Sequence, residues 1–533
     1  MYFGVAEPIQ HYTAPPEGTP ETMTAAREAM AITFHHYGVH AWAIYALVGL
    51  SLAYFTYRKG LPLTLRSGLH PLLGKRINGP LGDAIDIFGV CGTVFGVSTS
   101  LGFGVSQMTA GLAYNYGLPD TITSQVIVIA VVMGGATLSV LSGADRGVRR
   151  LSELNLTLAI LLMFFVMFWG PTLFLMNALV QNFGLYLDHF VMRTFTLYAY
   201  EPRAWMAGWT LFYWAWWIAW SQFVGMFIAR ISRGRTIRQF VVGVLFVPAG
   251  FTFLWMTVFG NTAIALDLGG AWGGIADAVQ ANLSTALFKF LEYLPGAGFT
   301  STLAIILVGV FFITSADSGA LVIDTLASGG ADETPRWQRM YWCLLLGVTA
   351  TLLLIAGGLG ALQTATLLAA LPLCLIMLLL GFGLVRQTSA DLAGVTLPDE
   401  AASVGERLKR LFVPASRREV TRQIATFGAP ALGRVRDAML AEGWANSHVE
   451  QGEESALLTI SFAPDRLFTY TAEPRQRPLA AYTALEASET RRSMTWIMAA
   501  RTGGEGRRRD LTGFSEEQIV GDILTQLEGW RPR

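Results

Sequence analysis

Long apolar runs constrain this chain more than any other feature of its sequence. An α-helix needs about 20 consecutive apolar residues to cross the hydrocarbon core of a bilayer. Charged residues make up only 14% of the chain, against about 25% in a typical soluble protein. The sequence therefore predicts an all-α polytopic membrane protein. We expect nine complete spans, at approximately 31–56, 83–115, 121–143, 150–176, 204–230, 239–260, 301–327, 338–357 and 361–386.

Basic residues alternate between the loops that join these spans. The loops at 116–120 and 358–360 contain no Lys or Arg. Because basic loops stay on the cytoplasmic side, the pattern predicts a cytoplasmic C-terminal segment. We expect the protein in the inner (plasma) membrane. The basic loops follow every second span, at 58–76, 146–150, 230–238, 336–339 and 386.

Four further segments have readable patterns. Residues 1–8 resemble the end of a span, and 9–27 are polar and rich in Pro, Thr and Glu, which predicts a water-facing loop. Mixed apolar and polar residues at 177–200 predict an interfacial helix. Residues 282–294 predict a short helix on the outer face.

Composition changes sharply near residue 390. Helical periodicity recurs at 419–442 and 516–528, and Leu457–Phe462 with Leu467–Ala472 predict a β-hairpin. We also expect a strand at Met494–Ala499. The chain is therefore divided into a transmembrane domain, residues 1–388, and a small cytoplasmic α+β domain, residues 389–533.

Several functions are disfavoured by what the sequence lacks. It has no nucleophile elbow, phosphate-binding loop, HExxH or CxxC motif, which disfavours an enzyme and indicates no cofactor. Its net charge is zero, so no nucleic-acid partner is suggested. Cys91, Cys343 and Cys374 lie in apolar segments without metal-type spacing and are interpreted as small buried hydrophobic residues.

Aromatic residues mark the spans at 31–56 and 204–230. Tyr213, Trp216, Trp217 and Trp220 recur at i, i+3, i+4 and i+7, which is one helix face. Such a face either packs against neighbouring helices or forms part of a cage in which ring faces bind a cation. Trp42 and Tyr45 share a face of the other span and could supply a second wall. The alternative for these rings is an interfacial aromatic belt.

Polar residues inside spans are the other candidates, because burying them in a membrane costs free energy. Thr314 and Ser315 could coordinate a small cation, although hydroxyls in helices commonly bond to their own backbone. Asp317 needs a partner or a wet cavity at that depth. The histidines near the outer end of the first complete span either relay protons or are ordinary interfacial residues; they are His35, His36 and His40.

These stretches together resemble the betaine–choline–carnitine transporter (BCCT) family, and most closely its BetT-type choline/betaine branch. The specific signature is the Trp-rich segment from Phe212 followed by the basic loop to Arg238. The other matching stretches are Ala6–Pro8, Trp42–Tyr45, Gly79–Pro80, Ser152–Asn155 and Thr314–Ser318.

The resemblance implies a secondary transporter that imports choline or a related quaternary ammonium compound, such as glycine betaine, by alternating access in osmoprotection. It also implies a LeuT-like core of inverted repeats and a homotrimer surrounded by membrane lipids. Carried over by position, the substrate cage is Trp42, Tyr45, Trp217 and Tyr37. The aromatics of the substrate pathway are Trp216, Trp220, Phe223 and Phe212.

The resemblance further places half of a sodium site at Phe311, Thr314 and Ser315, with Asp317 beside them. Sodium-coupled members have a second hydroxyl one turn after the position of Thr93, where this chain has Val97. That difference favours proton coupling over coupling to two sodium ions.

Family members have twelve spans, so we expect two and a half spans upstream of Met1, absent through truncation or a misassigned start. The alternative hypothesis is a non-transporting sensor or scaffold derived from such a transporter. An in-frame upstream extension encoding those spans would favour the transporter.

Overall fold

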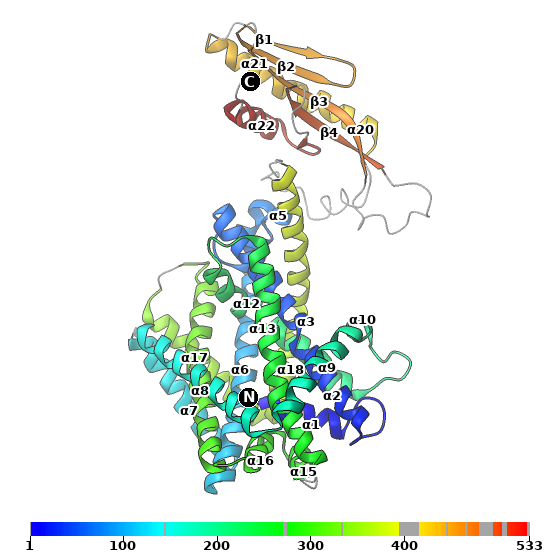
Figure 1. Cartoon of the computed structure of the whole chain (residues 1–533). Coiled ribbons are helices and arrows are strands. Elements are labelled where there is room, and N and C mark those ends of the chain that lie inside the picture. The colour runs from blue at the N-terminus through cyan, green and yellow to red at the C-terminus, as the bar shows by residue number, and fades with distance from the viewer. Residues whose placement is uncertain are drawn as a thin grey trace. The chain divides into compact units, whose positions relative to one another are not determined.

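The structure is a computed structural model in which the chain divides into two compact units. The first comprises residues 1–67 and 83–381, and the second comprises 68–82 and 382–533. The structure describes residues 2–142, 145–269, 274–331, 334–393, 415–443, 446–463, 466–478, 494–503 and 509–529 (Figure 1).

Helices account for all the regular structure described before residue 394. In chain order they are α1 Tyr2–Thr13, α2 Met23–Tyr37, α3 Val39–Ala53, η1 Tyr54–Arg58, α4 Leu65–Gly68, α5 His70–Leu73, η2 Gly74–Asn78, α6 Pro80–Tyr116, α7 Ile122–Ser142, α8 Asp145–Trp169, α9 Thr172–Asp188, α10 Phe190–Phe195, α11 Ala204–Met206, η3 Ala207–Leu211, α12 Phe212–Ile231, α13 Ile237–Met256, η4 Thr257–Asn261, α14 Thr262–Leu268, α15 Gly274–Ala281, η5 Leu283–Thr285, α16 Ala286–Glu292, α17 Ala297–Ala327 and α18 Arg336–Ala393.

Within the described residues, seven helical segments are long and apolar enough to cross a membrane, rather than the nine predicted. The segment that contains α12 is helical where predicted, but its many Trp and Tyr residues lower its mean hydropathy. The predicted spans 338–357 and 361–386 lie in the single segment α18, whose backbone leaves helical geometry at Gly357 and Gly358. The seven are Met23–Arg58, Pro80–Tyr116, Ile122–Leu141, Arg150–Trp169, Ile237–Leu268, Ala297–Ala327 and Arg336–Leu392.

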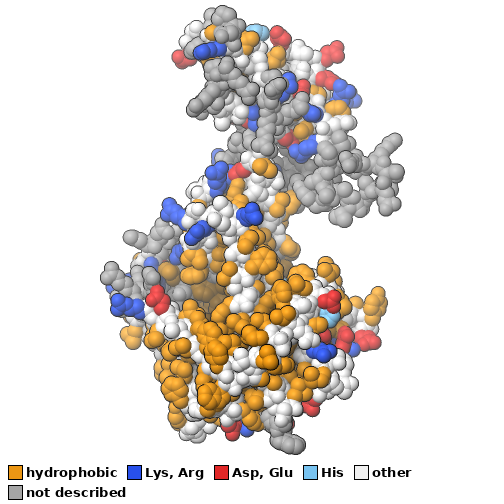
Figure 2. All heavy atoms as spheres, in the orientation of Figure 1, with side chains coloured by type: hydrophobic (Ala, Val, Ile, Leu, Met, Phe, Trp, Pro, Cys, Tyr) orange, Lys and Arg blue, Asp and Glu red, His pale blue; other side chains and the backbone are white. Residues whose placement is uncertain are grey.

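Large apolar side chains are exposed on these helices, as expected for surfaces that face lipid. Leu138 of α7, Phe168 of α8 and Leu371 of α18 are 70%, 68% and 70% exposed. Figure 2 shows hydrophobic side chains gathered over much of the visible face of the helical unit. An isolated soluble protein rarely exposes so large an apolar surface, so the distribution supports a multi-pass membrane protein.

The first complete span is two helices, because the backbone leaves helical geometry at Gly38 between α2 and α3. A Cβ atom there would lie 2.5 Å from the carbonyl oxygen of Phe34 and 2.8 Å from the hydroxyl of Tyr186. The break frees the amide of Val39, which donates a 3.0 Å hydrogen bond to that same Tyr186 hydroxyl. Gly38 thus provides the space for the break, and Tyr186 of α9 provides the acceptor for the freed amide. The break sets the direction in which α3 leaves α2.

Three predicted boundaries are wrong. Helix α1 continues to Thr13, and Ile9, His11 and Tyr12 are buried, so these residues belong to the core rather than to a water-facing loop. The span predicted at 150–176 ends at Trp169, because Gly170 and Pro171 interrupt it before α9. The interfacial segment predicted at 177–200 forms α9 and α10, which begin at Thr172 and end at Phe195. The short helix predicted at 282–294 is present as η5 and α16.

Helix α6 is a continuous helix whose glycines receive side chains from neighbouring helices. A Cβ at Gly92 would lie 2.1 Å from Leu373 of α18, and one at Gly104 would lie 1.8 Å from the ring of Phe312 of α17. The small residues of this helix therefore form a close-packing surface. Small residues at helix interfaces permit the close approach of backbones that membrane packing depends on.

The second unit contains an antiparallel sheet with strand order β1-β2-β3-β4-β5. Its core includes Leu458, Phe468, Tyr470, Leu432 and Ile519. The predicted hairpin, the strand from Met494 and both predicted helices are confirmed. Ser515 and Gln518 also form reciprocal side-chain-to-backbone bonds at the start of α22. The elements are α20 Arg417–Gln423, η6 Ile424–Gly428, α21 Ala429–Ala441, β1 Ser447–Gln451, β2 Ala456–Ala463, β3 Arg466–Pro478, β4 Met494–Thr502, β5 Arg509–Asp510 and α22 Glu516–Gly529.

Candidate functional site

Four aromatic rings from three helices form a continuous chain around Trp217. The ring centroid of Trp217 lies 5.5 Å from that of Tyr37 on α2 and 6.2 Å from that of Tyr45 on α3, with interplanar angles of 68° and 76°. Tyr45 in turn lies 5.5 Å from Trp42 at 75°. The structure therefore brings together all four residues predicted for the cage. Each ring meets the next edge to face.

Helices α3 and α12 approach closely enough to bring these rings together, because both carry glycine at their crossing. A Cβ atom on Gly225 would lie 3.0 Å from the backbone nitrogen of Gly49 and 2.9 Å from Val48. This close contact lies one to two helical turns from Tyr45 and Trp217. The glycine pair therefore sets the spacing of the two helices that carry the rings.

The aromatic face of α12 divides between two neighbouring structures. The indole nitrogens of Trp216 and Trp220 donate hydrogen bonds to α6, to the hydroxyl of Ser100 (3.0 Å) and the carbonyl of Gly96 (2.9 Å). Trp217 instead donates to the carbonyl oxygen of His36 over 2.9 Å. The single face predicted from spacing thus serves packing against α6 on one side and contact with the rings of α2 and α3 on the other.

The predicted pathway aromatics extend along α12 on both sides of the cage. Phe212 and Trp217 each stack on Trp216, with centroid distances of 5.3 and 5.4 Å. Phe223 contacts Trp220 edge to face at 5.1 Å. Phe212, Trp216 and Trp217 form a stack along the helix, and Trp220 and Phe223 form an edge-to-face pair beyond it.

Trp42 also faces a groove in the surface that α3, α12 and α13 form. The groove has a volume of about 410 Å³, and its other lining residues include Ile228, Phe240 and Pro248. Trp42 therefore links the ring chain to a surface groove, whereas Tyr45 is buried.

The predicted ion-coupling residues lie on α17. Phe311 is 49% exposed, and the Thr314 hydroxyl donates to the carbonyl of Phe311 over 3.0 Å. Ser315 is half-buried, and Asp317 accepts a 3.2 Å hydrogen bond from Ser139 of α7. The Thr314 bond is the back-bonding to its own helix that the sequence left open as an alternative.

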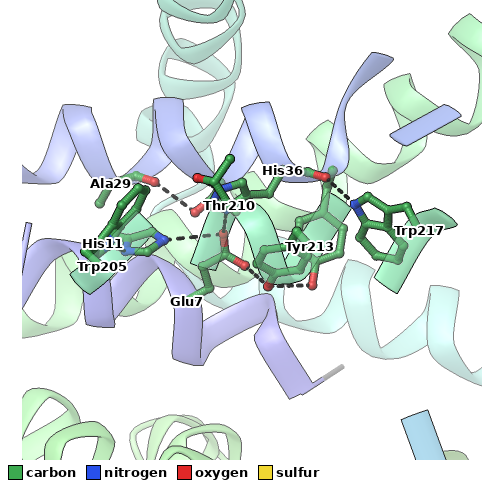
Figure 3. A network of polar contacts seen from close by, with 10 residues as sticks. Glu7, His11, Ala29, His36, Trp205, Thr210, Tyr213 and Trp217 are labelled. Carbon is green, nitrogen blue, oxygen red and sulfur yellow. Dashed lines mark hydrogen bonds and ion pairs between the residues drawn. The ribbon is translucent and has the colours of Figure 1, made fainter. Parts of the chain in front are cut away.

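A polar network that the sequence reading did not assign to the site lies beside the cage (Figure 3). The carboxylate of Glu7 on α1 is fully buried, as are the side chains of His11 and His36. Its Oε1 atom lies 2.7 Å from Nδ1 of His36 and 3.5 Å from Nε2 of His11. Its Oε2 atom accepts a hydrogen bond from the hydroxyl of Tyr213. A buried carboxylate requires such donors, because desolvating an unpaired charge costs several kcal/mol.

The network reaches the cage by two short routes. The hydroxyl of Tyr213 lies 3.1 Å from the hydroxyl of Tyr37, and Tyr37 contacts the ring of Trp217. His36 also offers its carbonyl to the Trp217 indole. The charged network and the aromatic rings therefore share residues and hydrogen bonds.

The spacing of Glu7, His11 and His36 resembles that of a metal site, since their ligand atoms lie within 4.8 Å of one another. The hydrogen bonds argue against it. The indole of Trp205 can only donate, and it faces Nδ1 of His11 at 3.3 Å, so the proton of the neutral ring is on Nε2. A metal-binding histidine needs a free lone pair on one nitrogen and donates from the other. In His11 the free lone pair is on Nδ1, which faces Trp205, and the proton is on Nε2, which faces Glu7. The nitrogen that would have to bind the metal therefore has no free lone pair.

A small polar cavity of about 110 Å³ adjoins His36. Thr210, whose hydroxyl lies 2.9 Å from Nε2 of His36, and Trp205 line its inner part. Glu28 and Arg193, which form an ion pair, line it as well. The cavity is roomy enough to hold water, because a single water needs only about 10–15 Å³ of such space.

Sequence reasoning missed Glu7 and His11 as site residues. The predicted boundary between a span end at 1–8 and a loop at 9–27 separates two side chains that lie one helical turn apart on α1. The i, i+4 spacing of a carboxylate and a histidine was the available signal. His36 was considered for proton relay, with an ordinary interfacial role left open.

Comparison with known proteins identifies the family. Residues 1–393 match the family described as "BCCT, betaine/carnitine/choline family transporter". The chain belongs to this family. The predicted family resemblance is confirmed, and because BCCT proteins are transporters, the chain is not an enzyme.

Individual BCCT proteins are similar over nearly the whole chain. A glycine betaine transporter of Acinetobacter baylyi is 52% identical over 99% of this chain and 81% of its own length. A high-affinity choline transport protein of Escherichia coli K12 is 39% identical over the same shares. An osmo-independent choline transporter of A. baylyi is 45% identical over 72% of this chain and 74% of its own length.

Proposed function

We propose that this BCCT protein imports glycine betaine, choline or a closely related quaternary ammonium compound by alternating access, as part of osmoprotection. The observation that carries the proposal is the chain of perpendicular rings formed by Trp42, Tyr45, Trp217 and Tyr37. The relatives that transport glycine betaine or choline support the same class of substrate.

An aromatic box suits this substrate because a quaternary ammonium group has no hydrogen to donate. It binds through its charge over ring faces, at roughly 0.5–2 kcal/mol per desolvated ring. Three or four rings at about 1 kcal/mol each supply about half of the roughly 8 kcal/mol that micromolar binding requires. Burial of the methyl groups, at about 25 cal/mol per Å², supplies the remainder.

We propose that transport is coupled to protons rather than to two sodium ions. Val97 has no side-chain oxygen and belongs to an apolar cluster between α6, α7, α17 and α18. A sodium ion needs oxygen ligands, which this position cannot offer. Phe311, Thr314, Ser315 and Asp317 remain the proposed ion-coupling residues of α17.

The wider organisation follows from the family proposal. The transporter domain, residues 1–388, would have a LeuT-like inverted-repeat core and assemble as a homotrimer in the lipids of the inner membrane. Residues 389–533 would form a cytoplasmic regulatory domain that responds to osmotic state or lipid. The arginines at 230, 233, 235 and 238, between the last turn of α12 and the first turn of α13, support this orientation, because basic loops stay inside.

Uptake competition tests the proposal. Accumulation of radiolabelled glycine betaine and choline in proteoliposomes would be measured under an imposed proton gradient, under an imposed sodium gradient and without a gradient. Carnitine would be added as the competitor. We expect accumulation of glycine betaine or choline with the proton gradient alone. If neither compound enters the proteoliposomes under any gradient, the result would contradict transport. Accumulation only with the sodium gradient would contradict proton coupling.

A further inference from the structure

We propose that the pair formed by Glu7 and His36 is the binding site of the transported proton. The inference rests on the proposed proton-coupled transport and assigns it to specific atoms. A proton from outer water binds Nε2 of His36, and the imidazolium that forms pairs with the Glu7 carboxylate. An N–H bond forms at Nε2 as an O–H bond of a hydronium ion breaks, and the proton leaves from the same nitrogen, back to water, when the site opens inward.

The hydrogen bonds around His36 accommodate both protonation states. In the neutral ring, Nδ1–H donates to Glu7 Oε1 over 2.7 Å, and Nε2 accepts from the hydroxyl of Thr210 over 2.9 Å. In the imidazolium, Nε2–H donates to Thr210, whose hydroxyl needs only to rotate, because a threonine hydroxyl both donates and accepts. The added charge lies next to a carboxylate that is fully buried, so the protonated pair carries no net charge.

The polar cavity supplies the path for the proton. It is lined by His36 and Thr210, the two residues between which the proton would bind, and by charged residues of the segments before α2 and in α10. Water in this cavity of about 110 Å³ would bring the proton to the wall that His36 and Thr210 form. The aromatic cage is therefore not on the proton's route, and the two ligands arrive separately.

We assign the proton to the pair of Glu7 and His36 after considering the other charged residues that line the cavity. Arg193 of α10 is ion-paired with Glu28 of α2, which compensates its charge, and Glu17 lies on the same cavity wall. Tyr213 of α12 donates to Glu7, and Tyr198 lines the cavity.

Three further titratable residues surround His36. His11 of α1 lies 3.5 Å from Glu7 but faces it with the N–H that Trp205 dictates. The ring of His35 lies 5.9 Å from the ring of His36 and 4.5 Å from that of His40 on α3. His40 bonds to Thr194 instead of Glu7.

Protonation of the pair affects substrate binding in the cage in two ways, through the charge of Glu7 and through the hydroxyl of Tyr213. Glycine betaine carries a carboxylate as well as its ammonium group, and an ionised Glu7 repels that carboxylate. A proton bound at His36 compensates the negative charge of Glu7 and so removes the repulsion. It also weakens the hydrogen bond that the Tyr213 hydroxyl donates to Glu7, and that hydroxyl also contacts Tyr37 of the cage. Proton and zwitterion therefore each favour binding of the other, as linkage requires.

The test compares His36→Gln and Glu7→Gln with His40→Gln in proteoliposomes at clamped membrane potential. With an inward proton gradient, wild type and His40→Gln should accumulate glycine betaine, whereas both pair variants should not. Equilibrium exchange of labelled betaine at equal pH, which moves no net proton, should still be measurable in the pair variants. Betaine binding followed by tryptophan fluorescence should strengthen by up to about tenfold per pH unit of acidification in wild type and stay flat in His36→Gln.

The outcomes separate the two proposals. Gradient-driven accumulation by both pair variants, with the pH dependence of wild type, would overturn the proton site while leaving transport intact. Loss of exchange as well as accumulation in both pair variants would indicate a purely structural role and overturn it too. Loss of wild-type accumulation on chelation, restored by Zn²⁺, would assign the residues to a metal instead. Failure of wild type to exchange betaine or choline would refute the proposed function itself.

Discussion

The indole N–H of Trp217 donates a 2.9 Å hydrogen bond to the carbonyl oxygen of His36. That carbonyl lies in the last turn of α2, where helix carbonyls lack intrahelical partners. The same residue directs its side chain to the buried carboxylate of Glu7. One residue of α2 thus contacts both the central ring of the cage and the carboxylate of the polar network.

Replacement of Trp217 should separate its ring from its hydrogen bond. Trp217→Ala removes the ring shared by Tyr37 and Tyr45, so we expect uptake of choline and betaine to be abolished while membrane insertion persists. Trp217→Phe keeps an aromatic face but leaves the buried His36 carbonyl without this donor, which should cost about 1–3 kcal/mol of stability.

Radiolabelled uptake and thermal unfolding in detergent measure the two effects. Trp337→Phe, at a position that is 64% exposed, is the matched control. Normal uptake by Trp217→Ala would exclude this ring from the cage.

Removing the hydroxyl of Tyr213 should destabilise the transporter domain. Tyr213→Phe leaves Oε2 of Glu7 buried without that donor, and an unsatisfied buried group costs about 1–3 kcal/mol. We expect a lower unfolding midpoint in detergent than for Tyr116→Phe. Tyr116 is 56% exposed and bonds to Thr302, so its loss should have little effect. Equal midpoints for the two variants would show that Glu7 does not depend on Tyr213.

Gly225→Ala should impair transport by separating α3 from α12. The added Cβ would lie 3.0 Å from the backbone nitrogen of Gly49, and backbone cannot move aside as a flexible side chain can. Overpacking of this kind typically costs about 1–3 kcal/mol, and it would widen the 6.2 Å separation of Tyr45 and Trp217. We expect a weaker apparent affinity for betaine in uptake assays. Gly250→Ala on α13, where a Cβ meets nothing within 4 Å, should behave as wild type.

The C-terminal domain should lose stability in alkali through Tyr470. Burial, reinforced by the neighbouring Asp522 carboxylate, raises the pKa of Tyr470 well above its usual value. The folded state therefore holds a proton that the unfolded state releases above about pH 10. Stability from this group is complete below that pH and declines as the pH rises further.

Urea unfolding of a fragment spanning residues 415–529, followed by the fluorescence of its two tryptophans, Trp444 and Trp496, would measure this decline. Tyr470→Phe removes the titrating group and should flatten the dependence above pH 10, while also losing the hydrogen bond to Asp522. An identical alkaline decline in the variant would show that another group is responsible.

Much of the architecture could be predicted because it depends on local pattern. Apolar runs of spanning length placed the helices, and the i, i+3 and i, i+4 spacings put Trp42 with Tyr45 and Tyr213 with Trp217. The hairpin in the C-terminal domain followed from alternating residues around Ala-Pro-Asp-Arg. Hydropathy alone was least informative for α12, whose aromatic residues make a buried helix look polar.

The sequence by itself determined that the chain crosses a membrane, which family it belongs to and which rings could form a cage. Only the tertiary structure decided that Glu7 meets His36, 29 residues away, and Tyr213, 206 residues away. Periodicity describes one helix at a time and carries no information about which helix covers its polar positions. A buried carboxylate is stable only where donors from other helices converge on it, and that convergence is a property of packing.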